Sequence, residues 1–157
     1  MENMPQLQLT RATPDDAPAI RQLVRDAYAK WVPIFGREPM PMTADYDKAV
    51  REHEVDMLHS GGIFVAVIEM IIRPGEVFIE NIAVAPGFLG QGLGRRLMAH
   101  AEARARALGL PRMGLLTGQL MQSNVRLYQS LGFQIDRTEP FKGGFTEYMS
   151  KDLAAVA

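Results

Sequence analysis

Three glycines at alternate positions, Gly90, Gly92 and Gly94, lie where an apolar strand over Val77–Val84 gives way to a helix. A glycine in a helix costs about 1 kcal/mol relative to alanine, so three at one helix start need another reason. Glycine lets the backbone come close to a ligand, and a helix N-terminus offers unpaired N–H groups and a partial positive charge. The turn over Ala85–Gln91 is therefore predicted to hold a phosphate group.

Two carboxylates interrupt apolar strand segments near the middle of the chain. Glu80 lies within VFIENIAV, and Glu69 lies within IFVAVIEMII. A carboxylate is costly to bury, and acids with perturbed pKa values cluster at functional sites. Glu80 is therefore the first candidate for acid–base chemistry and Glu69 the second. The alternative for Glu80 is a structural ion pair with a buried arginine.

A metal site is not expected. His53, His59 and His100 are isolated on predicted helices, where we expect them to face solvent, and they have no metal-ligand spacing. The sequence contains no cysteine, which excludes disulfides, thiolate zinc sites and a cysteine nucleophile.

Two common phosphate-binding patterns do not fit the glycine-rich turn. A Walker motif needs Gly-Lys-Ser/Thr, but Gly94 is followed by Arg95 and Arg96. A dinucleotide motif needs a glycine at the position that Arg95 occupies after Gly92.

The same residues instead resemble motif A of the GNAT acetyltransferase superfamily. That motif has Gln/Arg-x-x-Gly-x-Gly/Ala after a strand that ends in an apolar-Ala-Val-x-Pro run. Ile82–Pro86 and then Leu89–Gly94 follow it, except that Leu89 stands where the family usually has Gln or Arg. The resemblance implies that main-chain N–H groups of this turn hold the pyrophosphate of coenzyme A.

A second motif strengthens the resemblance. Leu127–Phe133, LYQSLGF, matches the Leu-Tyr-x-x-Leu-Gly-Phe run common in the superfamily, and Glu147–Leu153 resembles its usual last strand. The family often has Asn seven residues before this tyrosine, where this chain has Met121. Asn124 lies one turn later, so it either binds the cofactor arm or serves only as a helix N-cap.

The resemblance implies direct transfer of an acetyl group from acetyl-CoA to a primary amine in a ternary complex. A main-chain N–H near Val84 would stabilise the oxyanion, and Tyr128 would protonate the departing thiolate. Glu80, Glu69 or a water chain would take the amine proton; some family members have Glu at the position of Glu80. The expected coenzyme A contacts are Ile82, Ala83, Val84, Leu89, Gly90, Gln91, Gly92, Leu93, Gly94, Arg95, Asn124 and Tyr128.

The acceptor is expected opposite the cofactor, between the first two helices and the last loop. Aromatic and charged residues on and beside a proline-rich loop are its candidate contacts: Tyr28, Trp31, Phe35 and Arg37, with Tyr46 and Phe145 nearby. For Trp31, core packing is the alternative. We expect a small-molecule amine, the alternatives being a protein N-terminus or lysine, or a non-catalytic module that binds acetyl-CoA.

The elements that position these residues are predicted to form an α/β (α+β) fold, the GNAT-like acyl-CoA N-acyltransferase fold, with a central mixed sheet flanked by helices. Helices are expected from Thr13 to about Trp31, from Thr43 or Asp45 to Ser60, from Gly92 to Gly109, and from Ser123 to Gly132. The third carries a core stripe of Leu93, Leu97, Ala101, Ala105 and Leu108.

The expected strands are Leu7–Arg11, Ile63–Ile72, Val77–Val84, Met113–Thr117, Phe133–Arg137 and Phe145–Lys151. Loops are predicted over Val32–Met42 and Thr138–Gly144, and a turn over Arg73–Glu76. The family has two strands before that of motif A, so either Ile63–Ile72 is one long strand replacing two or one strand is lost.

The whole sequence favours one domain over residues 1–157. The net charge of −1, from 17 basic and 18 acidic residues, gives no electrostatic reason to expect nucleic acid. The N-terminal residues lack a signal-peptide pattern, and no apolar run is long enough to span a membrane. We therefore expect a cytoplasmic protein without a membrane partner, and the resemblance favours a homodimer.

Overall fold

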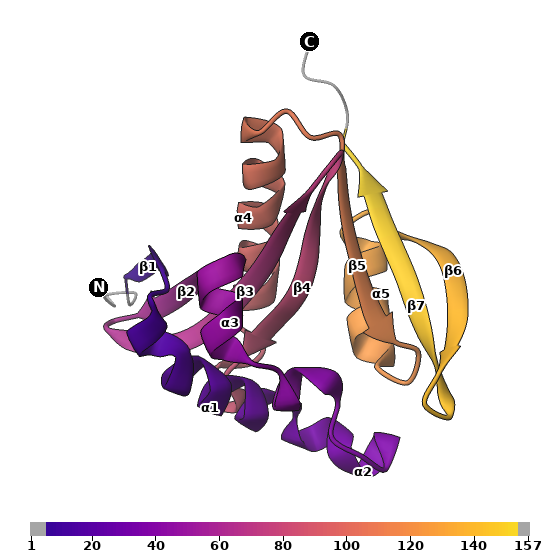
Figure 1. Cartoon of the computed structure of the whole chain (residues 1–157), viewed down its shortest axis with the longest axis horizontal. Coiled ribbons are helices and arrows are strands. Elements are labelled where there is room, and N and C mark those ends of the chain that lie inside the picture. The colour runs from indigo at the N-terminus through magenta and orange to yellow at the C-terminus, as the bar shows by residue number, and fades with distance from the viewer. Residues whose placement is uncertain (1–5, 154–157) are drawn as a thin grey trace.

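The computed structural model describes residues 6–153; residues 1–5, which belong to the segment assessed above for a signal peptide, and residues 154–157 lie outside it. One seven-stranded sheet has the order β1-β2-β3-β4-β5-β7-β6 (Figure 1). The strands are β1 Leu7–Arg11, β2 Glu54–Ser60, β3 Ile63–Arg73, β4 Glu76–Val84, β5 Arg112–Gly118, β6 Gln134–Phe141 and β7 Gly144–Asp152. The helices are α1 Ala17–Tyr28, α2 Val32–Phe35, α3 Tyr46–Glu52, α4 Leu93–Ala107 and α5 Gln122–Ser130.

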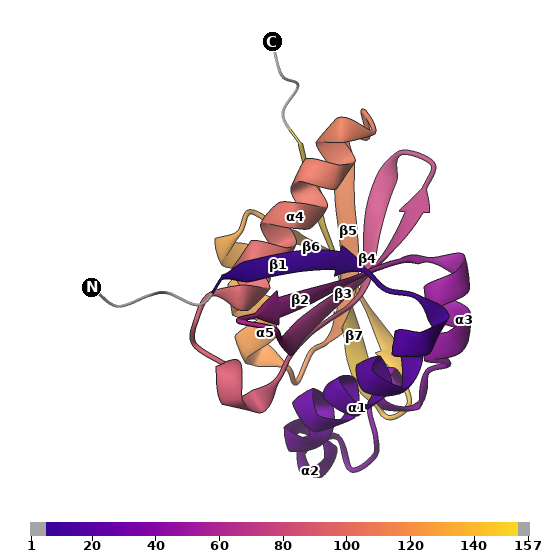
Figure 2. The same ribbon diagram turned by 90° about the vertical axis from the view of Figure 1, so that its left-hand side faces the viewer.

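Helices cover both faces of the sheet, which confirms the predicted mixed sheet flanked by helices. In Figure 2, α4 and α5 lie on one side and α1 and α3 on the other. Each face has its own apolar core, one including the buried residues of α4 and the other those of α1. Among residues 6–153, no helix has the length and apolarity needed to cross a membrane.

The stripe predicted on α4 is confirmed at four of its five positions. Leu93, Leu97, Ala101 and Ala105 are buried in the first core. Leu108 is 40% exposed, because the helix has ended at Ala107 and Leu108 is its C-cap.

The second predicted helix is half wrong. Helix α3 ends at Glu52, His53 is extended, and Glu54–Ser60 forms β2 between β1 and β3. Both faces of this strand are buried, Val55 in one core and Leu58 in the other. A strand apolar on both faces lacks clean alternation and cannot be told from a helix by its pattern.

This strand also answers the question about Ile63–Ile72. That segment is one strand, β3, and its hairpin partner β2 supplies the second strand, so none is lost. Gly61 and Gly62, which follow the predicted helix end at Ser60, form the β2–β3 turn with φ of 56° and 85°. The predicted Arg73–Glu76 turn joins β3 to β4 and is confirmed.

Both predicted loops contain regular structure. In the first, α2 spans Val32–Phe35 with Pro33 in its first turn, where proline needs no N–H partner. In the second, β6 continues to Phe141, and only Lys142 and Gly143 form the turn, both with positive φ. Such a two-residue turn matches the twist of a hairpin.

The one parallel pair in the sheet opens partway along its length. Strand β4 pairs with β5 only from Val77 to Ile79, opposite Met113 to Leu115. The register of β4 against β3 shifts between Ile79 and Asn81, leaving Glu80 as a bulge residue. Beyond it the strands diverge, with α1 and α2 below the opening (Figure 1).

A buried charge cluster lies on β2, away from this opening. Asp56 accepts hydrogen bonds from Arg11 Nε at 2.6 Å and from His100 Nε2 at 2.8 Å. Burial acts to raise the pKa of Asp56, but the two hydrogen bonds outweigh it, so the pKa lies below its ordinary value. The expectation that His100 faces solvent is therefore wrong.

Replacing Asp56 with Asn is expected to lower the free energy of unfolding by about 1–3 kcal/mol at pH 7, because the negative charge beside Arg11 is lost and one of the two acceptor oxygens becomes an NH2 group. A carboxylate with a depressed pKa in the folded state stabilises at pH values above its unfolded pKa, about 3.9. The difference from wild type should therefore vanish as the pH falls through that value and the folded one below it.

Urea denaturation at pH 7 and in acid measures this difference. Asp47→Asn is the control, because Asp47 forms an exposed pair with Arg51 and should cost less than about 0.5 kcal/mol. A pH-independent loss for the Asp56 variant would show that packing, not charge, is responsible.

Candidate active site

The glycine-rich turn joins the open end of β4 to the start of α4. Gly90 and Gly92 have φ of 79° and 76°, which gives two of the three glycines a local conformational reason. No side chain caps α4, and its first hydrogen bond runs from Arg96 N–H to the Gly92 carbonyl at 3.0 Å. The N–H groups of Leu93, Gly94 and Arg95 are thus not used within the helix and suit an anion.

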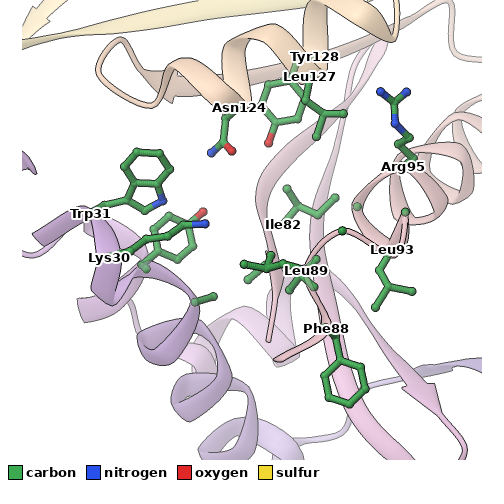
Figure 3. A pocket seen from close by; sticks show the side chains of 17 residues that line it. Lys30, Trp31, Ile82, Phe88, Leu89, Leu93, Arg95, Asn124, Leu127 and Tyr128 are labelled. Carbon is green, nitrogen blue, oxygen red and sulfur yellow. The ribbon is translucent and has the colours of Figure 1, made fainter. Parts of the chain in front are cut away.

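A cleft of about 280 Å³ lies between this turn, α1 and α5 (Figure 3). Of the residues predicted to contact coenzyme A, all except Gln91 line this cleft. Those that do are Ile82, Ala83, Val84, Leu89, Gly90, Gly92, Leu93, Gly94, Arg95, Asn124 and Tyr128.

Tyr128 reaches the cleft from α5. It is 6% exposed, and its hydroxyl points into the cavity (Figure 3). Burial raises the pKa of the Tyr128 phenol to about 12, so the group carries its proton at neutral pH. A protonated phenol facing a cavity is suited to act as a general acid.

Asn124 is not the N-cap of its helix. Met121 occupies the N-cap position, and Asn124 lies in the first turn of α5. Its side chain faces the cleft opposite Trp31 (Figure 3), and its amide lies 3.7 Å from the Met121 sulfur. The N-cap alternative is wrong, and the cofactor-contact alternative stays a prediction.

A second cavity, of about 110 Å³, adjoins the cleft where β4 and β5 diverge beyond Ile79. Tyr28, Phe35 and Arg37 line it, as predicted for acceptor contacts, whereas Trp31 lines the first cleft. The residues that line both spaces are Tyr28, Ile82, Asn124 and Tyr128. Tyr128 thus lies at the boundary between the two.

The other two aromatic candidates lie outside this cavity. Tyr46 is buried, and its hydroxyl donates to the Pro41 carbonyl. Phe145 is half exposed and lines a shallow pocket at the β6–β7 turn together with Phe35.

Glu80 lines the second cavity but is not buried. The bulge turns its side chain outward, so that it is exposed, and Asn81 is buried beside it. Within residues 6–153 Glu80 makes no ion pair or side-chain hydrogen bond, so the buried-arginine alternative is wrong. The expectation that Glu80 is a costly buried charge is also wrong.

The buried carboxylate is Glu69. Burial raises its pKa, and a hydrogen bond with His53 Nδ1 at 2.6 Å opposes the rise. His53 is therefore paired instead of facing solvent freely. Both residues line a further cavity of about 390 Å³, which Glu80 also lines. In the part of the chain that the structure describes, no three His, Asp or Glu side chains form a metal site.

A hydrogen-bond chain fixes the floor of the second cavity. Tyr28 OH donates to Asn81 Oδ1 at 2.8 Å, and Asn81 Nδ2 donates to Tyr46 OH at 3.2 Å. Burial raises the pKa of both phenols, so each stays a donor. The chain ties α1 and α3 to the bulge of β4.

Several lining residues were not predicted. Phe88 immediately precedes Leu89 of the first motif and Leu127 is the first residue of the second, so the motifs themselves could have indicated both. Lys30 lines the cleft and Phe141 the second cavity only because α1 and the β6–β7 hairpin fold over the opening. No local pattern marks either residue.

Comparisons with known proteins agree with this geometry. The family model described as Acetyltransferase (GNAT) family matches residues 18–133. The amino-acid acetyltransferase of Ralstonia nicotianae is 37% identical over 112 residues, which cover 69% of this chain and 23% of that protein. The mouse N-alpha-acetyltransferase 80 is 38% identical over 71 residues, covering 45% of this chain and 21% of that protein. The chain thus spans less than a quarter of either relative.

Among solved structures, the PaiA N-acetyltransferase from Thermoplasma acidophilum in complex with coenzyme A is similar over the whole fold. It has a TM-score of 0.77 and 14% identity, and the match covers 94% of this chain and 99% of that one. Because the family model matches most of the sequence, including both motifs and the residues lining the cleft, this chain belongs to the GNAT acetyltransferase family.

Proposed function

We propose that this chain transfers the acetyl group of acetyl-CoA to a primary amine of a small molecule, directly, in a ternary complex. The observation that carries the proposal is the boundary between the two cavities. Tyr28, Ile82, Asn124 and Tyr128 line both, so a donor in the cleft and an acceptor in the second cavity would meet at the Tyr128 hydroxyl.

The residues of the cleft fit coenzyme A. The uncapped start of α4 offers N–H groups to a pyrophosphate, and positions 90, 92 and 94 have no atom within 4 Å of where a Cβ would lie, leaving the backbone open to a ligand. The edge of β4 that faces β5 is unpaired beyond Ile79, so an extended arm could bond to its backbone.

The bound donor would supply an activated acetyl thioester. Within the chain, backbone N–H groups near Val84 would stabilise charge on the carbonyl oxygen, and Tyr128 would give its proton to the sulfur as the bond to carbon breaks. Glu80 would accept the proton that the amine loses as it forms the new bond. The products are an N-acetylated amine and the free thiol.

The acceptor cavity favours a small amine over a protein. It holds about 110 Å³, and its lining includes Phe35, which packs on Gly118, and Arg37, whose guanidinium lies over the Phe141 ring. The likeness to an amino-acid acetyltransferase agrees with this choice, whereas the likeness to an N-alpha-acetyltransferase covers less of the chain.

Thiol release measured with acetyl-CoA and a broad panel of amines tests the proposal. We expect turnover that needs both substrates and initial-rate lines that intersect, as a ternary complex requires. Tight binding of coenzyme A with no turnover would support the non-catalytic alternative. Acetylation of peptides but not of small amines would overturn the acceptor class.

The packing of Phe35 gives a further prediction. In Gly118→Ala the new Cβ would lie 2.7 Å from Phe35 Cζ, so the ring must move. Overpacking of this kind costs about 1–3 kcal/mol, and we expect the KM for the acceptor to rise about three- to tenfold while coenzyme A affinity holds. Gly144→Ala is the control, because its Cβ would meet only Phe141 O at 3.8 Å. An unchanged acceptor KM would show that Phe35 does not shape the site.

A further inference from the structure

The second cavity has two charged side chains among its lining residues, and their charges are opposite. Arg37 comes from the segment after α2, and Glu80 from the bulge of β4. The remaining lining is mostly apolar, including Ile79, Leu115 and Met121. A ligand that fills this cavity therefore meets one cation, one anion and an apolar wall.

Arg37 has no acidic partner within residues 6–153. The neighbouring carboxylate, Glu38, is bound instead by Arg25, with Nη2 to Oε1 at 2.8 Å. The Arg37 guanidinium lies 5.7 Å from the ring of Phe35 and 5.5 Å from that of Phe141. Among the described residues, its one hydrogen bond runs from Nη1 to the Glu38 carbonyl oxygen at 3.3 Å.

The two rings hold the guanidinium in place without satisfying its N–H groups. A guanidinium has five donors in a planar fork that matches the two oxygens of a carboxylate. Stacking on aromatic rings orients such a fork and leaves its edge free. Arg37 is thus positioned to bind an anion that the chain itself does not provide.

Glu80 has the complementary property. It lines the same cavity, accepts no hydrogen bond from any residue of the described part of the chain, and is half of no ion pair there. A cavity with an unpaired cation and an unpaired anion is electrostatically complementary to a zwitterion.

We propose that the acceptor is a compact amino acid whose free carboxylate binds Arg37 while its amino group faces Glu80. This inference rests on the proposed acetyl transfer and names its acceptor class. In a protein, the residue that carries the reacting amine has its carboxyl group in a peptide bond, so it offers Arg37 no carboxylate. The same two charges therefore discriminate against protein acceptors. The apolar wall favours an apolar side chain on the acceptor.

Matched acceptor pairs test this assignment. For glycine, alanine, valine, leucine, methionine and phenylalanine, kcat/KM is measured for the free acid and for its amide, each corrected for the fraction present as neutral amine. Loss of a charge-assisted bidentate contact should cost the amide about 10- to 100-fold relative to the acid. A preference for amides would overturn the proposal.

Substitution of Arg37 separates recognition from structure. Arg37→Gln should remove most of the preference for the acid, measured as the ratio of kcat/KM for the acid to that for the amide, and Arg37→Lys should restore part of that ratio. Lys142→Gln is the matched control, since Lys142 also lies over Phe141, at 5.5 Å, but does not line the cavity. An equal loss for acid and amide in Arg37→Gln would mean that Arg37 only supports the fold.

Calorimetry keeps the assignment testable if no acceptor is turned over. Leucine or methionine is titrated into the protein saturated with coenzyme A. Binding that Arg37→Gln abolishes would support the amino-acid site even though the proposed transfer had failed. Absence of binding to the wild type, with coenzyme A bound, would overturn the site itself.

Discussion

Replacing Tyr128 with Phe is expected to lower kcat by about 10²- to 10³-fold and to leave coenzyme A affinity nearly unchanged, as loss of a general acid should. The substitution removes only the hydroxyl that points into the cleft (Figure 3). The ring still packs on Phe133, with centroids 6.1 Å apart, so the fold should keep its stability. Single-turnover thiol release and calorimetry with coenzyme A measure the two quantities separately.

The raised pKa of Tyr128 adds a constraint on pH. With a pKa of about 12, the phenol stays protonated below about pH 11, and wild-type kcat should show no basic limb from this group in the neutral range. The Phe variant should therefore show a lower pH profile of the same shape.

Tyr148→Phe is the control for this experiment. Tyr148 stacks on Arg137 at 3.9 Å and lines neither the cleft nor the acceptor cavity, so its hydroxyl should not matter for turnover. If Tyr128→Phe turned over at the wild-type rate, the proton for the thiolate would have to come from water, and Tyr128 would leave the mechanism.

The cofactor half of the site could be predicted because its signals are local. The turn after β4 is marked by consecutive residues: an apolar strand, then closely spaced glycines, then a helix start without a capping side chain. Together these local features indicate a phosphate-binding turn. Tyr128 is separate in sequence, but its own motif is equally local. Each of these features depends on backbone conformation within one segment, which short patterns report well.

The acceptor half could be predicted only in part, because its geometry comes from pairing between segments. Glu80 is exposed since the register of β4 against β3 slips beside Glu69, and a slip belongs to the pair of strands, not to either sequence. Arg37 was a candidate only because it is a charged residue on the proline-rich loop after Trp31. Its orientation depends on Phe141, which the β6–β7 hairpin brings from a distant part of the chain.

The missed strand has the same physical origin. Glu54–Ser60 is buried on both faces because helices cover both faces of the sheet at β2. A strand that needs apolar residues on both faces has no apolar–polar alternation, so its sequence resembles the apolar stripe of a helix. Only its pairing with strands on either side distinguishes the two. The two strands that the family has before motif A indicated that one strand had not been assigned. They did not indicate that Glu54–Ser60 forms it.

Glu80→Gln is expected to lower kcat by about 10²- to 10³-fold at neutral pH, because the amine loses the carboxylate that accepts its proton. Glu80 is the one acid among the residues lining the acceptor cavity. In the variant only an acceptor bound as the neutral amine can react. The deficit relative to wild type should therefore shrink as the pH approaches the pKa of the amine.

Glu69→Gln distinguishes the two carboxylates. Glu69 is buried, its side chain is engaged by His53, and it lines the neighbouring cavity, not the acceptor cavity. An amide there still offers His53 an oxygen, so activity should stay within about threefold of wild type at every pH. The reverse pattern, a pH-dependent loss only in the Glu69 variant, would move the base to Glu69 and make Glu80 a recognition group. Full activity in both variants would mean that a chain of water molecules removes the amine proton. The exposed bulge at Glu80 would then be the place where these waters reach the amine.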